Sequence, residues 1–187
     1  MTRLLLVSLF SAGIVGCSSN GVQETSIGDI PEWVMSPKVE NGIAVSDCTI
    51  FSGNFSIDRK QAIANGRTLL AAEIESKVES LDETYTDKSQ IDNESTSGTS
   101  FSSVSKQYVN QTLTGSRTLK TDIIKIDGRD NLCVMVGIEE GKTKELFDAI
   151  VKASNRKLSA NSEDVLYQQF KAQQARDRLA VESEKYN

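Results

Sequence analysis

The alternation of apolar and polar positions predicts three β-strands. Residues 42–52 are rich in β-branched and small apolar side chains, as is typical of a strand. Residues 117–127 form a second extended stretch, whose apolar positions change phase between Ile123 and Ile124, and this predicts either a β-bulge or burial on both faces. Residues 132–138 are almost continuously apolar, so we expect the central strand there.

A helical spacing of apolar residues predicts the first long helix after the first strand. Ser56 is the expected N-cap and Asp58 falls in the first turn, where a negative charge is favourable. The helix is expected to end near Leu81. Its apolar stripe consists of Ile63, Leu70, Ile74, Val78 and Leu81. Residues 83–100 are polar and low in complexity, and they predict a mobile loop.

Three further helices are expected, over residues 101–113, 142–154 and 163–185. Asn161 or Ser162 is the expected N-cap of the last one. Its narrow apolar stripe would consist of Val165, Ala172, Ala175 and Leu179, with Leu166 and Phe170 on the flank. A stripe this thin buries little within one domain. Two interpretations remain open, in which the helix packs on a neighbouring subunit or frays.

The order of these elements predicts an α+β fold. A turn at residues 127–131 joins the last two strands into a hairpin. The fewest chain crossings then give a three-stranded antiparallel sheet in the order 2-3-1, with helices packed on one face and an added C-terminal helix. We expect this domain to cover residues 31–156, with residues 157–187 forming a C-terminal helical extension.

The N-terminal residues have the pattern of a secretory leader. Arg3 precedes an apolar stretch that is too short to span a bilayer. Ile14-Val15-Gly16-Cys17 then matches the bacterial lipobox, so we expect residues 1–16 to be a signal peptide cleaved after Gly16, with lipid attached to Cys17. The alternative is an ordinary signal peptide with an incidental cysteine. Ser18 in the second mature position favours the outer membrane, because aspartate there favours retention in the inner membrane.

A lipidated tether is expected over residues 17–30, which are small and polar. Its thirteen residues after Cys17 reach at most about 45 Å when extended, so the domain would stay close to its membrane. Trp33, the only tryptophan, comes directly after this segment. Two interpretations of Trp33 remain open, a plug at one edge of the core and an exposed contact for a partner.

Composition narrows the possible chemistry. The chain has no histidine, which excludes Ser-His-Asp and Cys-His catalysis and His-ligated zinc. The net charge is −5 without a basic cluster, so we expect no nucleic-acid partner. The tightest acidic groups are interpreted as solvated surface: Glu73/Glu75, Asp82-Glu83, Glu139-Glu140 and Glu163-Asp164. We therefore expect no catalytic residue, no metal and no cofactor beyond the covalent lipid.

Two cysteines remain besides Cys17. Cys48 falls in the first predicted strand and Cys133 in the third, and the predicted strand order makes these strands neighbours. In an oxidising compartment they would form a disulfide. The alternative is a pair of buried free thiols.

The chain resembles the LPP-twenty family of bacterial lipoproteins. The resemblance rests on the lipobox, the segment Pro31-Glu-Trp-Val34, the Ala-rich helix from Arg59 with Ile74 and Val78 near its end, and the closing hairpin, over roughly residues 31–140. It implies an outer-membrane protein with a small sheet-and-helix domain. Several members, including flagellar basal-disk lipoproteins, assemble into rings or discs, and the family has no shared catalytic motif.

These observations together predict a periplasm-facing lipoprotein of the outer membrane. We expect a non-enzymatic structural or assembly component of the cell envelope, held to the membrane by its lipid and bound to protein partners or to itself. A flagellar association is one option. The alternative is a regulatory binding module that acts on an envelope synthase or another periplasmic partner.

Overall fold

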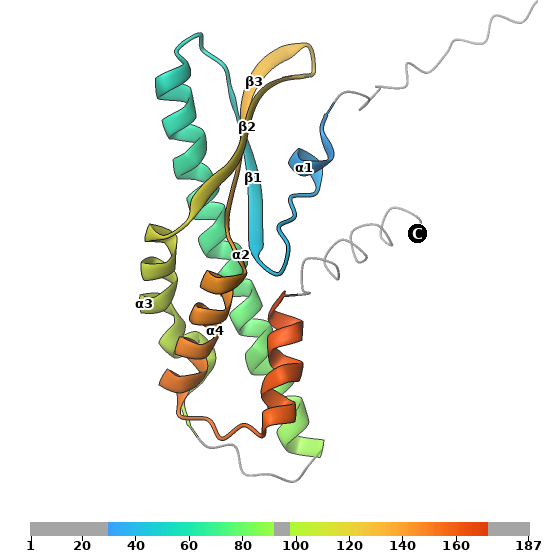
Figure 1. The fold of residues 1–187 in the computed structure, drawn as a ribbon, viewed down its shortest axis with the longest axis vertical. Coiled ribbons are helices and arrows are strands. Elements are labelled where there is room, and N and C mark those ends of the chain that lie inside the picture. Colours follow the sequence, from blue (N-terminus) through green and yellow to red (C-terminus); the bar gives the residue numbers. More distant parts are fainter. Residues whose placement is uncertain (1–29, 92–97, 172–187) are drawn as a thin grey trace, which may run out of the picture.

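The computed structural model describes residues 30–91 and 98–171. The elements in chain order are α1 (Glu32–Met35), β1 (Ile43–Ile50), α2 (Phe55–Ile91), α3 (Phe101–Thr114), β2 (Arg117–Ile126), β3 (Arg129–Ile138) and α4 (Glu140–Ser154). A further helical segment covers residues 160–171. Figure 1 shows an elongated molecule with two parts. The sheet half contains the three strands and the beginning of α2, and the helical half contains the rest of α2, α3, α4 and segment 160–171.

The sheet confirms the predicted α+β class and strand order. Its order is β1-β3-β2, and both pairs are antiparallel. The apolar run of β3 is buried from Leu132 to Ile138, as expected of a central strand. The irregularity in β2 lies between Thr118 and Lys120 rather than at the phase change. Ile123 and Ile124 instead lie on opposite faces of a regular ladder, the first exposed and the second buried.

Helix α2 packs along β1 and β3 on one face of the sheet, which we call the α2 face. Gly66 makes this close packing possible, because a Cβ atom at that position would lie 2.9 Å from Val136 Cγ2. The short helix α1 lies on the opposite face, which we call the α1 face (Figure 1). The helices α3 and α4 extend the fold beyond the sheet, where α3 contacts α2 and α4 contacts α3.

Both ends of α2 differ from the prediction. The N-cap is Asn54 rather than Ser56, because the Asn54 side chain accepts a hydrogen bond from the Ile57 amide at 3.3 Å. The helix continues to Ile91, so the loop predicted over residues 83–100 is wrong for its first part. Tyr85 explains the extension, because its ring is buried edge-on against Phe101 of α3. Residues 92–97 lie outside the described part of the chain.

The last helical segment also differs in its cap and in its buried side. Ser159 is the cap, since its hydroxyl accepts a hydrogen bond from the Ser162 amide at 3.2 Å. The predicted stripe through Val165 was wrong: that residue is exposed, whereas Leu166 and Phe170 are buried against the helical half. Phe170 packs on Phe147 of α4 with 5.7 Å between ring centroids. Ala172, Ala175 and Leu179 lie outside the described residues.

Candidate interaction site

Helix α1 attaches the N-terminal segment to the sheet. The Ser46 hydroxyl of β1 donates a hydrogen bond of 2.7 Å to the Trp33 carbonyl, which holds α1 on its face of the sheet. The Trp33 side chain is half-buried, so one part contacts the sheet half and another stays accessible. The described chain therefore enters the domain on the α1 face. Gly16 and Cys17, the predicted cleavage and lipidation sites, lie outside the described residues.

A disulfide joins the two predicted strand cysteines on this same face. Cys48 of β1 lies directly opposite Cys133 of β3 in the ladder, and their sulfur atoms are bonded. Ser46 lies two residues before Cys48, so both side chains point to the α1 face. The disulfide links the first strand of the domain to its central strand across 85 residues of sequence.

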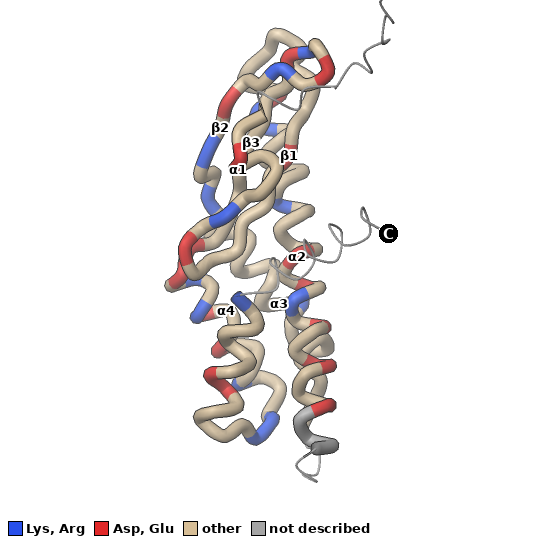
Figure 2. Tube along the Cα trace, turned by 90° about the vertical axis from the view of Figure 1, so that its right-hand side faces the viewer, with Lys and Arg blue, Asp and Glu red and all other residues tan. Residues whose placement is uncertain are grey.

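The two edges of the sheet have different surfaces. Four charged side chains, those of Arg117, Lys120, Asp122 and Lys125, follow along β2, and the register shift near Thr118 interrupts its ladder. Charges and bulges of this kind discourage pairing with another strand. Along β1 the only charged residue is Asp47, which receives a hydrogen bond from Asn65 of α2 at 3.2 Å. The β1 edge therefore lacks the protection that the β2 edge has (Figure 2).

The backbone of β1 leaves hydrogen-bonding groups on its outer side. The Phe51 amide donates a hydrogen bond to the Asp130 carbonyl. In an antiparallel pair every second residue is hydrogen-bonded to the partner strand, so every second residue before Phe51 also points its N–H and C=O groups toward β3. The backbone groups of Ser46, Cys48 and Ile50 therefore point away from the sheet. Among the described residues none hydrogen-bonds to these groups. The Ile50 side chain is also 58% exposed, which makes this end of the strand apolar as well as unpaired.

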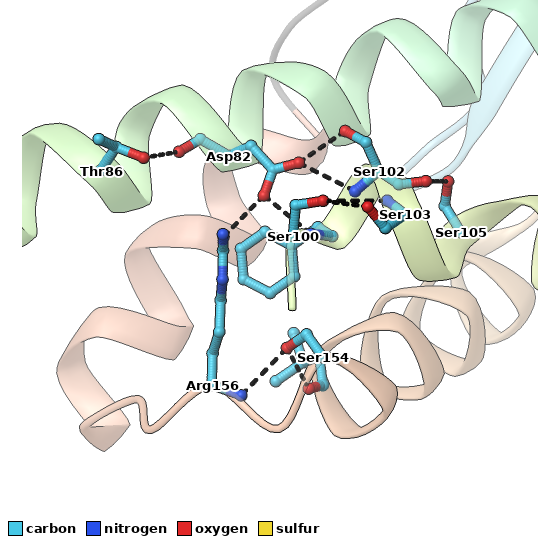
Figure 3. Close-up of polar contacts among 10 residues, drawn as sticks. Asp82, Thr86, Ser100, Ser102, Ser103, Ser105, Ser154 and Arg156 are labelled. Atoms are coloured by element: carbon cyan, nitrogen blue, oxygen red, sulfur yellow. Dashed lines mark hydrogen bonds and ion pairs between the residues drawn. The ribbon is translucent and has the colours of Figure 1, made fainter. Parts of the chain in front are cut away.

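A partly buried polar cluster joins the elements of the helical half. The Asp82 carboxylate of α2 accepts hydrogen bonds from the amides of Phe101 and Ser102 at 2.8 and 2.9 Å, at the first turn of α3. It also forms an ion pair of 2.7 Å with Arg156, which follows α4 (Figure 3). The Arg156 guanidinium lies 4.3 Å from the ring centroid of Tyr85. This Asp82–Arg156 cluster thus connects α2, α3 and the end of α4.

The Asp82–Arg156 cluster was not predicted, because Asp82 was interpreted as part of the solvated surface. That assignment is wrong for Asp82, whose side chain is only 19% exposed. A usable signal was its spacing, four residues after Val78 and three before Tyr85, which places it on a helix face with two core residues. Glu73 also has a buried partner, since it lies 3.5 Å from Lys77, which is 1% exposed. Glu139 and Glu140 are exposed, as interpreted.

Two surface grooves occur among the described residues. The first, of about 540 Å³, lies between the end of α3 and the start of α4, and Tyr108, Lys142 and Glu145 contribute to its lining. The second, of about 440 Å³, lies between residues 38–42 and segment 160–171. Within residues 30–91 and 98–171 no His, Cys, Asp or Glu side chains gather in a group that could hold a metal ion.

Two side chains near α4 have shifted pKa values. The hydrogen bond from Lys144 to Asp148 raises the pKa of the lysine, and burial raises the pKa of the Tyr167 phenol. The Lys144 Nζ lies 5.3 Å from the Tyr167 ring centroid. Both shifts favour the protonated forms that these groups already have near neutral pH. The pair therefore stays in its protonated form near neutral pH, with the lysine ammonium against the tyrosine ring.

Comparisons with models of known protein families, with curated proteins and with solved structures give no match. In the described part of the chain, no helix has the length and apolar character needed to cross a membrane.

Proposed function

We propose that this chain is a lipid-anchored protein of the bacterial outer membrane that faces the periplasm and acts as a non-enzymatic assembly component of the envelope. The leader motif Ile14-Val15-Gly16-Cys17 carries this proposal. Acylation of Cys17 would insert several hydrocarbon chains, each contributing about 0.8 kcal/mol per buried CH₂. Ser18 after the lipidated cysteine supports the outer rather than the inner membrane. The flagellar option rests on the family resemblance alone.

Two features of the fold support an anchored protein in an oxidising compartment. The Cys48–Cys133 disulfide fits the periplasm, where such bonds persist, better than a reducing cytoplasm. The described chain also begins beside α1 on one sheet face, so a lipid on Cys17 would hold the sheet half by a short tether. The open edge of β1 supports an assembly role, since edge strands are common sites of pairing between chains.

Metabolic labelling with a tagged palmitate analogue, followed by separation of inner and outer membranes, tests the anchoring. The wild-type full chain is expected to carry the label and to fractionate with the outer membrane. Cys17→Ser should lose the label, because no thiol remains to accept the lipid. Ser18→Asp should stay labelled but move to the inner membrane, and Ser19→Asp is the matched control that should behave as wild type. An unlabelled or soluble wild-type protein would overturn the proposal.

The mass of the detergent-solubilised native particle tests the assembly role. A particle containing several copies of the chain is expected. A single copy that co-purifies with an envelope synthase would instead support a regulatory binding module.

A further inference from the structure

We propose that a second copy of this chain binds at the open edge of β1, strand against strand and antiparallel, with the two Cys48 residues facing each other at a two-fold axis. The inference deepens the proposed assembly role and rests on it. Pairing would join the two sheets into one continuous sheet. The three outward-pointing residues Ser46, Cys48 and Ile50 provide the hydrogen-bonding groups for this ladder.

The single charge of β1 selects the register of this pairing. A register centred on Asp47 would place two carboxylates directly opposite each other, which is destabilising. A register centred on Cys48 instead places Asp47 opposite Thr49 of the second copy, whose hydroxyl can donate to the carboxylate. The hydrogen bonds of this register also involve only backbone groups that have no partner among the described residues. Ser46 and Ile50 of the two copies then form opposed pairs on either side of the axis.

The same register covers the exposed end of β1 on the α1 face. Ile50 would lie opposite Ser46 of the second copy, and Ser46 is the residue whose hydroxyl holds α1 through the Trp33 carbonyl. The exposed Ile50 side chain would therefore reach the neighbourhood of Trp33 in the second copy. By symmetry this contact forms twice. The contact would give both Ile50 and the accessible part of Trp33 an apolar neighbour.

The geometry of anchoring favours a second copy as the occupant of this edge. Two antiparallel strands in one sheet are related by a two-fold axis perpendicular to that sheet. Figure 2 shows α1 in front of the sheet of one copy, so both α1 helices would then lie on the same face of the joined sheet. Both tethers would leave from that face, so both lipids could enter one bilayer. The β2 edge is a poorer site, because Lys120, Asp122 and Lys125 follow along it.

Site-specific cross-linking of the lipidated full chain in membranes tests the pairing and its register. Ser46→Cys and Ile50→Cys are made in separate, differently tagged copies and joined with a short bismaleimide, which reacts with free thiols and leaves disulfides intact. Co-expressed copies should give a mixed cross-linked dimer, because the two positions face each other. Either variant alone should give none, since equivalent thiols would lie about 14 Å apart, four residues along the strands.

A matched pair of substitutions tests whether the edge itself is responsible. Ile50→Lys, placed in the Ser46→Cys copy and co-expressed with the Ile50→Cys copy, should abolish the mixed dimer, because a lysine at the edge blocks pairing. Ile57→Lys is the control, since Ile57 is 61% exposed but lies on α2 away from β1. It should leave the dimer unchanged. An intact Cys48–Cys133 disulfide and an unchanged unfolding midpoint verify that each variant folds.

The outcomes separate this inference from the anchoring proposal. If the protein is labelled and folded but gives no mixed dimer, the edge pairing is wrong and the anchoring proposal is unaffected. The same conclusion follows if each variant cross-links with itself as efficiently as with the other. Capture of a different protein by the edge thiols also overturns it, since the occupant would not be a second copy. A mixed dimer in a protein without palmitate label overturns the anchoring alone.

Discussion

Different interactions stabilise the sheet half and the helical half. In the sheet half, an apolar central strand is buried between its neighbours and bonded covalently to β1 through Cys48 and Cys133. In the helical half, α2, the start of α3 and the segment after α4 meet at one partly buried carboxylate, Asp82, and its partner Arg156. We therefore expect a reducing agent to weaken mainly the sheet half, and a substitution that removes the charge of Asp82 to weaken mainly the helical half. It also assigns the proposed anchor and the open edge to the covalently linked half.

Removal of the disulfide is the largest expected change, and it acts on the sheet half. Replacing both Cys48 and Cys133 with Ala should lower the free energy of unfolding by about 4 kcal/mol, because the bond closes a long loop in the unfolded chain. Denaturant unfolding of the oxidised wild type and the variant measures this. If dithiothreitol leaves the wild-type midpoint unchanged, the sheet half does not depend on the bond.

Asp82→Ala tests the helical half. The substitution leaves Arg156 mostly buried without its partner and removes the acceptor for two α3 amides, so we expect a loss of about 3 kcal/mol in unfolding free energy. Hydrogen exchange should then rise in α3 and at residues near Arg156, while β3 stays protected. Glu83→Ala is the matched control, because the neighbouring Glu83 is exposed. Uniform loss of protection in both halves would contradict the comparison.

Gly66→Ala tests the contact between α2 and the sheet. The new methyl group would lie 2.9 Å from Val136 Cγ2, and overpacking outweighs the gain in helix propensity, so we expect a net loss of about 1 kcal/mol. Gly141→Ala in α4 is the control, since no atom lies within 4 Å of its added Cβ. Thermal melts of the two variants should shift in opposite directions. Equal shifts would show that Gly66 is not needed for the close approach.

The smallest expected effect concerns the exposed pair Arg117 and Glu139, which lies where the two halves meet at the start of β2 and of α4. Their 3.5 Å contact is between exposed side chains, so a double-mutant cycle with Ala should give a coupling below about 0.5 kcal/mol. Equilibrium unfolding of the four proteins measures this term. A coupling as large as that of the Asp82–Arg156 cluster would mean that surface charges, rather than buried ones, hold the junction.

The sheet half was the more predictable part. The apolar run at 132–138, the turn before it and the β-branched first strand gave the strand order, and the two cysteines fell into facing positions. These features are local patterns whose period differs for strands and helices. The register shift near Thr118 was not predictable, because no residue there differs from an ordinary strand residue.

The helical half was less predictable because its helices depend on contacts distant in sequence. The polar stretch after Leu81 is helical because Tyr85 packs on Phe101, which sequence spacing alone does not reveal. Leu166 and Phe170 were placed on a flank, although they complete the core around Phe147. The role of Asp82 requires Arg156, which lies 74 residues away in the sequence.

The most direct test of an envelope lipoprotein is the mass of the N-terminal peptide of the mature protein. The protein is isolated from bacterial membranes with any attached lipid left in place. We predict a chain that begins at Cys17 and carries acyl chains on that residue, with nothing remaining of residues 1–16. A mature protein that begins elsewhere, or at Cys17 without lipid, would contradict membrane anchoring of the sheet half.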